Sequence, residues 1–502
     1  MKIQQFLEHH GIRRNPFAEE DAQTDVVFKE HCIASTYHPI WDKIYGDPHE
    51  PSTSIVFGEK GSGKTALRLQ IARHIRHHNR QHPNQQLFVI HYDDMNPFLD
   101  RFRSTLGRRH RRRADRVLRE WKLWDHMDAI LSLGVTGLVD RLLGVRQPSG
   151  GVEADLDPAA ADRLDRDQAR DLLLLAACYD QSTSTTFRDR WHALRKRLRF
   201  SNWSSYGPLA AGISGTLLML VLWGVVASHG WTQGWVSLLA LLLIAISWKP
   251  WLWQAVGAVW LARCIRRQMR LSNRDTPTLR AVLSHFTAHE LAAQPLPTKD
   301  STDDRYEMLM KLQACLQTLG FRGIIVLMDR LDEPHLINGS AELMKALLWP
   351  ILDNKFLKHP GFGLKIMAPI ELTRFVDRED REFYQRARLD KQNMVESFQW
   401  TGEALYDVAS ARLAACAVDE QGTPTLRQLI DPAVSDRRIV EALRLLRTPR
   451  HLFKFLYRLF VQHCNSHVEG QESWEISAEN FESMLALYQR DQDAFDRGLG
   501  AG

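Results

Sequence analysis

The stretch SIVFGEKGSGKT, residues 54–65, determines which fold we expect for this chain. From Gly58 onward it satisfies the pattern G-x-x-x-x-G-K-[ST], in which glycines let backbone N–H groups turn toward phosphate oxygens. A short apolar strand precedes the pattern, and the helix expected after it places Leu67, Ile71 and Ile75 on one face. Because strand, loop and helix follow in the order that such a loop requires, the stretch predicts a phosphate-binding loop rather than an ordinary glycine-rich turn.

This loop is expected to bind a nucleotide through its backbone and through two side chains. The helix that follows points its positive end at the phosphates. Lys64 is expected to reach the terminal phosphates, and Thr65 to supply a hydroxyl group to Mg²⁺. ATP and Mg²⁺ are therefore the expected cofactors. The candidate nucleotide-binding residues are Gly58, Glu59, Lys60, Gly61, Ser62, Gly63, Lys64 and Thr65.

The second half of such a site is an apolar strand that ends in an acid, and IIVLMDRLDEP supplies one at Asp329. A carboxylate there can complete the magnesium site opposite Thr65. In many ATPases with an extra central strand a second acid follows directly and polarises the attacking water, but here Arg330 holds that place. Asp332 and Glu333 are the substitutes, with Glu333 favoured, and the alternative is a solvated turn.

Other polar residues are candidates for sensing or stabilising the transferred phosphate. Arg450, which follows Pro449 at the start of a predicted C-terminal helix, can supply positive charge to the phosphate, or it is a surface arginine. Arg386 and Arg388 can act across a subunit boundary. Glu371 and Thr373 follow another strand and either sense the terminal phosphate or are simple strand-end polar groups.

The remaining strand candidates predict a doubly wound parallel sheet, because short apolar runs alternate with helix-compatible sequence. These runs are residues 87–94, 323–329, 364–372 and 394–400. From residue 401 onward the pattern is helical and predicts a lid domain. The expected domains are 1–100 and 271–400 for the two parts of the NTPase domain, 101–200 for a helical insertion, 201–270 for a membrane hairpin with a flanking helix, and 401–502 for the lid.

A long apolar segment interrupts this pattern, since residues 201–248 contain no Asp, Glu, Lys or Arg. Residues 209–228 are long enough to cross a bilayer, whereas 235–248 are short unless the span begins at Trp231 or continues past Pro250. Arginine-rich flanks at 195–199 and 263–270 predict that both ends are cytoplasmic. The alternatives are a buried helical hairpin inside an oligomer and a re-entrant segment.

Composition limits the other possibilities. The 502 residues are enough for about two or three domains. With 65 basic and 60 acidic residues, the net charge of +5 is too small for a protein whose whole surface binds nucleic acid. The six cysteines lack C-x-x-C spacing, which favours reduced thiols, and the start does not resemble a secretory signal. The basic run RRHRRR at 108–113 is either a solvated or lipid-facing surface or a nucleic-acid contact.

With these features the chain resembles the KAP family of P-loop NTPases, which are related in logic to the STAND signalling ATPases. The motifs that carry the resemblance are GEKGSGKT, IIVLMDRLDE and TPRHLFKFL. In that family a membrane hairpin lies between the phosphate loop and the acidic strand, as it does here between Thr65 and Asp329. The family's Asn-Pro-Arg motif corresponds to residues 448–450, so the resemblance implies a catalytic role for Arg450.

We therefore expect an ATPase that is anchored in the bacterial inner membrane, with most of the chain in the cytoplasm, and that acts as a signalling or conflict switch. The resemblance implies antiphage defence, a homo-oligomer, and a phage trigger or partner protein. One alternative is a motor or transport ATPase at the membrane. Another is a nucleotide-gated scaffold that does not hydrolyse ATP, because Arg330 stands in the position of the water-activating acid.

Overall fold

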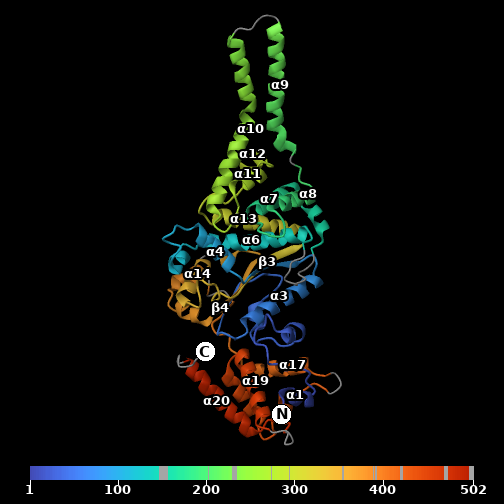
Figure 1. Cartoon of the computed structure of the whole chain (residues 1–502), viewed down its shortest axis with the longest axis vertical. Coiled ribbons are helices and arrows are strands. Elements are labelled where there is room, and N and C mark those ends of the chain that lie inside the picture. Colours follow the sequence, from blue (N-terminus) through green and yellow to red (C-terminus); the bar gives the residue numbers. More distant parts are fainter. Residues whose placement is uncertain are drawn as a thin grey trace. The chain divides into compact units, whose positions relative to one another are not determined.

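The structure of the chain is a computed structural model (Figure 1). It describes residues 1–145, 156–201, 203–228, 234–272, 274–292, 294–352, 355–387, 389, 393–418, 422–467 and 473–496. The predicted connection between the two apolar segments, which includes Trp231, and the candidate Arg388 lie outside these residues.

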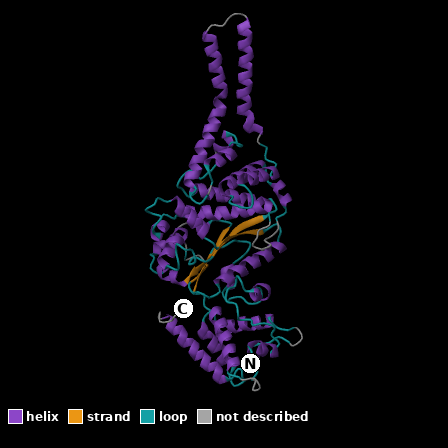
Figure 2. Cartoon of the chain, viewed as in Figure 1, coloured by secondary structure: helices purple, strands orange, loops and turns teal. Residues whose placement is uncertain are grey.

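A five-stranded sheet organises the α/β part of the chain (Figure 2). Its order is β2-β3-β4-β1-β5, and β1 pairs in parallel with β4 and β5. The strands are β1 (Ser54–Gly58), β2 (Gln86–Tyr92), β3 (Phe321–Met328), β4 (Phe362–Pro369) and β5 (Asn393–Val395). Every residue of β1 and β4 is buried, as expected for strands that are covered on both faces. The prediction of a parallel α/β sheet is confirmed.

The last predicted strand, 394–400, is wrong in its length, because β5 ends at Val395. Its partner β1 ends at Gly58, where the chain turns away into the glycine-rich loop. Beyond Val395 the next backbone contact is a hydrogen bond from Phe398 N to Phe57 O at 2.8 Å. The end of the partner strand therefore limits the ladder.

The chain divides into two compact units. The first contains residues 1–81, 325–345 and 352–502, and the second contains residues 82–324 and 346–351. The division passes through β3 and through the helix α14 (Ala341–Leu352), so neither unit is a continuous piece of sequence.

The first unit combines the loop strand with the C-terminal helices. From residue 402 onward the described chain is mostly helical, and the N-terminal α1 packs into these helices through Phe6 against Phe460. The helices of this unit are α1 (Ile3–His9), α2 (Trp41–Tyr45), α3 (Lys64–Gln81), α15 (Thr373–Val376), α16 (Arg381–Ala387), α17 (Gly402–Ala415), α18 (Asp436–Leu446), α19 (Pro449–Asn465) and α20 (Ala478–Asp496).

The second unit packs its helices around buried ion pairs. Asp128 accepts hydrogen bonds from Tyr179 and from Arg305, and all three side chains are buried. Burial raises the pKa of Asp128, and Arg305 opposes that rise. Its helices outside the apolar segment are α4 (Asn96–Thr105), α5 (Ala114–Arg119), α6 (Leu123–Leu142), α7 (Arg166–Tyr179), α8 (Phe187–Arg197), α11 (Thr276–Leu283), α12 (Ala288–Ala292) and α13 (Asp303–Thr318).

The apolar segment forms two antiparallel helices, α9 (Gly207–Ser228) and α10 (Gly234–Gln268). Both are long and apolar enough to cross a membrane, and only 6% and 0% of their respective 18-residue apolar windows is buried within the described chain. The second segment is not short, because α10 continues through Pro250. A proline removes a single backbone hydrogen bond, and apolar helices tolerate that loss. A helical hairpin buried within the described chain is excluded.

Close contacts between small and aromatic residues set the register of this hairpin. Trp248 Nε1 donates a hydrogen bond to Thr216 Oγ1 at 2.8 Å. A Cβ atom at Gly212 would lie 3.1 Å from the Trp248 ring, and one at Gly215 would lie 2.7 Å from Ser247 Cβ. The glycines therefore let α9 approach α10 closely along this face.

This register predicts which cysteine pair forms a disulfide. In a Cys264→Ser background, Gly215→Cys with Ser247→Cys should crosslink on oxidation, because a small shift brings their Cβ atoms to the usual disulfide separation of about 3.8 Å. The control pair, Gly224→Cys with Ser247→Cys, should not, because a Cβ atom at Gly224 meets nothing within 4 Å.

The crosslink is measured in carbonate-washed membranes, after cleavage at a protease site inserted between α9 and α10. The two fragments should stay joined without reductant for the first pair alone. Equal crosslinking of both pairs would refute the register, and loss of the chain in the carbonate wash would refute a membrane-spanning hairpin.

Candidate functional site

The loop between β1 and α3 folds tightly around the amino group of Lys64. Its Nζ donates hydrogen bonds to Gly58 O at 2.7 Å and to Glu59 O at 2.8 Å. Gly61 and Gly63 have φ angles of +87° and +95°, which side chains rarely permit. The sequence pattern of glycines is thus required by the backbone of this loop.

The electrostatic environment of Lys64 combines burial with surrounding acids. Burial lowers the pKa of its amine, because desolvation disfavours the charged form. The carboxylates of Asp329, Asp332 and Glu371 oppose this effect. Three predicted acids therefore face the same lysine.

The side chains predicted to hold a magnesium ion lie in direct contact. Thr65 Oγ1 donates a hydrogen bond to Asp329 Oδ2 at 2.9 Å, although the residues are 264 positions apart. The guanidinium of Arg68, one turn along α3 from Lys64, lies 3.3 Å from the same oxygen, and both its side chain and that of Asp329 are at most 4% exposed. The backbone N–H of Arg330 donates to Asp329 Oδ1 at 2.9 Å. This carboxylate is thus fixed in position from three sides.

The candidate water-activating residues follow in a turn directly after β3. Arg330 has a φ angle of +60°, which turns the chain sharply at the position where a second acid would directly follow Asp329. Its guanidinium lies 3.3 Å from Glu333 Oε2. Burial raises the pKa of Glu333, and Arg330 opposes that rise. Asp332 and Glu333 both line the same cavity as Lys64.

The C-terminal helices contact the loop at two points. The Trp400 indole N–H donates to Ser62 O at 2.8 Å, and the backbone N–H of Arg450, at the start of α19, donates to Gly61 O at 3.3 Å. A Cβ atom at Gly61 would lie 2.6 Å from Arg450 Cβ. The guanidinium of Arg450 also lies 3.5 Å from a carboxylate oxygen of Glu20. The structure therefore places Arg450 at the loop.

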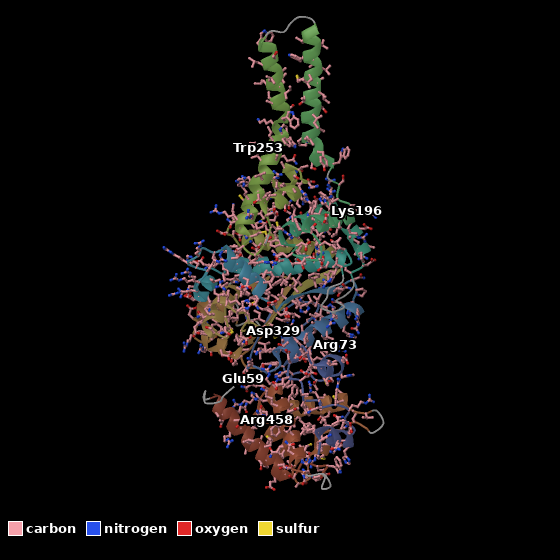
Figure 3. All side chains as sticks on the ribbon, viewed as in Figure 1. Glu59, Arg73, Lys196, Trp253, Asp329 and Arg458 are labelled. Atoms are coloured by element: carbon pink, nitrogen blue, oxygen red, sulfur yellow. The ribbon has the colours of Figure 1, made fainter. Side chains whose placement is uncertain are left out.

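One cavity of about 360 Å³ brings most of the predicted residues together. It is lined by the loop, by the turn after β3 and by residues of the N-terminal and C-terminal regions, all within the first unit. Asp329, which lines the cavity, and Glu59 of the loop are labelled in Figure 3. The predicted residues that line it are Lys60, Gly61, Gly63, Lys64, Thr65, Asp329, Asp332, Glu333, Glu371 and Arg450.

Four predicted residues of the described chain do not line this cavity: Gly58, Glu59, Ser62 and Thr373. Thr373 does not line it, and its hydroxyl donates to Ile370 O at 2.7 Å. Its polarity serves the turn after β4, which was the alternative interpretation. Arg388 and the side chain of Arg386 lie outside the described residues, so their suggested action across a subunit boundary stays a prediction.

The cavity also contains residues that sequence reasoning missed. The His38 ring stacks on Phe398 at 4.0 Å, its Nε2 lies 2.8 Å from Gln399 O, and burial lowers the pKa of His38 to about 4. His38 is therefore neutral at neutral pH. The side chain of Arg412 pairs with Asp25 at 2.6 Å. No local pattern marks these residues, because their neighbours come from distant segments.

The Asn-Pro-Phe sequence near the N-terminus was a partial signal for this missed region. Pro16 O accepts a hydrogen bond from Arg412 Nε at 2.7 Å, and Phe17 packs against Phe453, which also lines the cavity. The N-terminal segment is thus attached to the C-terminal helices beside the cavity.

The arrangement can bind an anion at the loop and a hard cation beside it. Among the described residues there is no cluster of three or more His, Cys, Asp and Glu side chains that could hold a metal ion. Thr65 and Asp329 together are instead a site with two protein ligands. Such a site suits Mg²⁺, which usually keeps several waters and binds phosphate oxygens as well.

Comparisons with known proteins add no family to these findings. No protein-family model matches the chain, and neither a search of curated proteins nor a search of solved structures found a match.

Proposed function

We propose that the chain binds and hydrolyses Mg-ATP as a membrane-anchored switch. One observation carries this proposal: the Thr65 hydroxyl group at the end of the loop meets the Asp329 carboxylate at 2.9 Å. Hydroxyl and carboxylate are the two protein ligands that a P-loop uses for magnesium. Their contact is the arrangement that a nucleotide site of this class needs.

The order of the strands supports a P-loop fold and the resemblance to KAP ATPases. β4 lies between β1, which leads into the loop, and β3, which ends at Asp329. This is the extra central strand expected of the class that activates water with an acid beside the magnesium ligand. The same order brings the carboxyl ends of β1 and β3 to one edge of the sheet, where ligands of open α/β sheets bind.

For hydrolysis, Glu333 would accept a proton from the attacking water while the bond from the β–γ bridging oxygen to the γ-phosphorus breaks, giving ADP and phosphate. Its raised pKa suits a proton acceptor, and Arg330 holds its carboxylate. Lys64 and Arg450 would stabilise the charge on the transferred phosphoryl group. Mg²⁺, when bound, would neutralise charge on the phosphates. Asp332 is the alternative base.

A switch function is supported by the contacts between the loop and the C-terminal helices. Trp400 and Arg450 bind loop carbonyl oxygens directly. A phosphate group bound in the loop would therefore change the surroundings of the hydrogen bonds that Trp400 and Arg450 make to the loop. We propose that helices α17 to α20 act as a lid whose packing responds to the nucleotide.

Membrane anchoring is proposed from α9 and α10, whose apolar side chains are mostly exposed in the most apolar part of each helix. The basic flanks support a location of both ends of the hairpin in the cytoplasm of a bacterial cell, at its inner membrane. A homo-oligomer is proposed because sites of this kind often use a charge from a neighbouring subunit.

Two alternatives have specific support. A motor or transport ATPase would use the same nucleotide site, but Asp, Glu, Lys and Arg, which mark transport paths inside membrane spans, are absent from residues 201–248 of the sequence. A scaffold that binds ATP without hydrolysing it is favoured by Arg330 in the position of the second acid. Turnover measurements distinguish the scaffold from the switch.

Nucleotide binding should depend on Lys64, at the start of α3, and not on Arg80 near the end of that helix. Lys64→Ala removes the only side-chain amine bonded to the loop carbonyls among the described residues and should weaken binding of a fluorescent ATP analogue by at least about tenfold, equivalent to about 1.4 kcal/mol. Arg80→Ala, which removes an exposed positive charge of α3 that does not line the cavity, is the control and should bind nearly normally. Equal affinities for the two variants would contradict the proposed site.

Hydrolysis should depend on one acid of the turn after β3. Glu333→Gln should lower steady-state ATP turnover by about 10² or more, the usual range for a lost general base, with binding retained. Asp332→Asn should lower it much less. If Asp332→Asn is the inactive variant, Asp332 rather than Glu333 is the general base. If the intact chain binds ATP without turnover, the scaffold alternative is correct.

The defence role is drawn by analogy with the family that the chain resembles. Cells expressing the intact chain should survive phage challenge better than cells expressing Lys64→Ala at equal protein level, because nucleotide binding by the variant is weakened. Plaque counts on both strains measure the difference. Equal survival across a broad phage panel would contradict the defence role but not the ATPase.

A further inference from the structure

The basic run identified in the sequence forms a hollow of arginines in the second unit. It lies between α4 and α5 and at the start of α5, and it measures about 360 Å³. All five residues that line it are arginines and all are exposed: Arg108, Arg109, Arg112, Arg113 and Arg116.

These arginines lack acidic partners within the described part of the chain. None of its ion pairs includes one of the five guanidinium groups, and the nearby Asp115 pairs with Arg119 at 3.8 Å. Elsewhere in this unit arginines are matched by acids, as Arg190 is by Asp140 and Asp180. Five like charges around one hollow repel one another, so the hollow favours a ligand with several negative charges.

The position of the hollow disfavours an anionic membrane as this ligand. In the hairpin Gly212 packs against Trp248, so the first residue of α9, Gly207, lies opposite about Trp253, which Figure 3 shows at the base of the hairpin. From Trp253 to Gln268, α10 rises about 22 Å. Arg270, just beyond that end, donates to Glu120 O directly after α5 at 3.4 Å.

The hollow is therefore about two to three Debye lengths from the proposed membrane surface, since the Debye length is about 8 Å at physiological ionic strength. The surface charge of the lipid is largely screened at that distance. In Figure 1, α4 likewise lies beside α6 rather than along the hairpin.

We propose that this arginine hollow binds nucleic acid through its phosphate backbone. Five guanidinium groups in nine residues require a ligand of high charge density, and duplex DNA carries one charge per about 1.7 Å of its axis. An extended acidic peptide has a lower density of negative charge, because the side chains on one face of an extended chain recur only about every 7 Å. Guanidinium groups also suit phosphate through paired hydrogen bonds. Since contacts to backbone phosphates carry no sequence information, binding should not depend on base sequence.

This proposal goes beyond nucleotide hydrolysis and does not rest on it. It uses the proposed membrane span only to exclude lipid. Binding should therefore persist in Lys64→Ala, and its loss there would show that the two sites are not independent.

The test measures binding of a fluorescent 20-base-pair duplex, and of single strands of equal length, to the full chain in neutral-lipid nanodiscs. The double variant Arg109→Gln/Arg112→Gln should weaken binding on the order of tenfold or more and reduce the slope of log K against log salt by about 2, because each phosphate contact contributes about 0.9. The control Arg437→Gln/Arg444→Gln removes the same charge from exposed arginines of α18 and should leave both values nearly unchanged.

Three outcomes would overturn the proposal. The first is the absence of duplex and single-strand binding at low salt. The second is an equal loss of nucleic-acid binding in the two double variants, which would show an effect of net charge alone. The third is binding of anionic but not neutral vesicles that depends on Arg109 and Arg112 while nucleic acid is not bound, which would identify lipid headgroups as the ligand.

Discussion

The hydrogen bond from Thr65 Oγ1 to Asp329 Oδ2 joins two segments that are 264 residues apart in the chain. Between them the sequence contains the helices of the second unit and the whole apolar hairpin. The bond can form only if β1 and β3 end at the same edge of one sheet, with β4 between them. The sheet therefore reunites the two halves of the candidate site after a long insertion, and the chemistry proposed for the site depends on that reunion.

Around this bond, charge is balanced in a small volume. Asp329 faces Thr65, Arg68 and the backbone of Arg330, and Lys64 is bonded to loop carbonyls while acids surround it. Buried charges are costly unless they are paired, so the position of each of these groups constrains the others. The contacts of Arg450 and Trp400 extend the constraint to the C-terminal helices. The loop, the acid and these helices thus form one connected set of contacts within the first unit.

Much of the fold could be predicted because its signals are local. Four apolar runs correspond to β1 to β4, and Leu67, Ile71 and Ile75 are buried on one face of α3 as their spacing predicts. The predicted length of β5 was wrong, because the length of an edge strand is limited by the end of its partner strand rather than by its own sequence. The second apolar helix was underestimated at Pro250, since a proline in an apolar helix need not end it. The His38, Asp25 and Arg412 contacts could not be predicted, because each depends on segments from opposite ends of the chain.

The sequence by itself determined the identity of the loop, the acid that ends β3 and the uncharged length of the hairpin, because each is a contiguous pattern with a direct physical requirement. Glycines permit positive φ angles. A buried apolar strand ends at the residue that carries the carboxylate. The absence of charged side chains permits contact with lipid. Only the tertiary structure decided that Thr65 touches Asp329, that Arg450 packs on Gly61, and that five arginines surround one hollow without acidic partners among the described residues. These are relations between side chains from separate elements, and they depend on how the sheet and helices pack rather than on spacing along the chain.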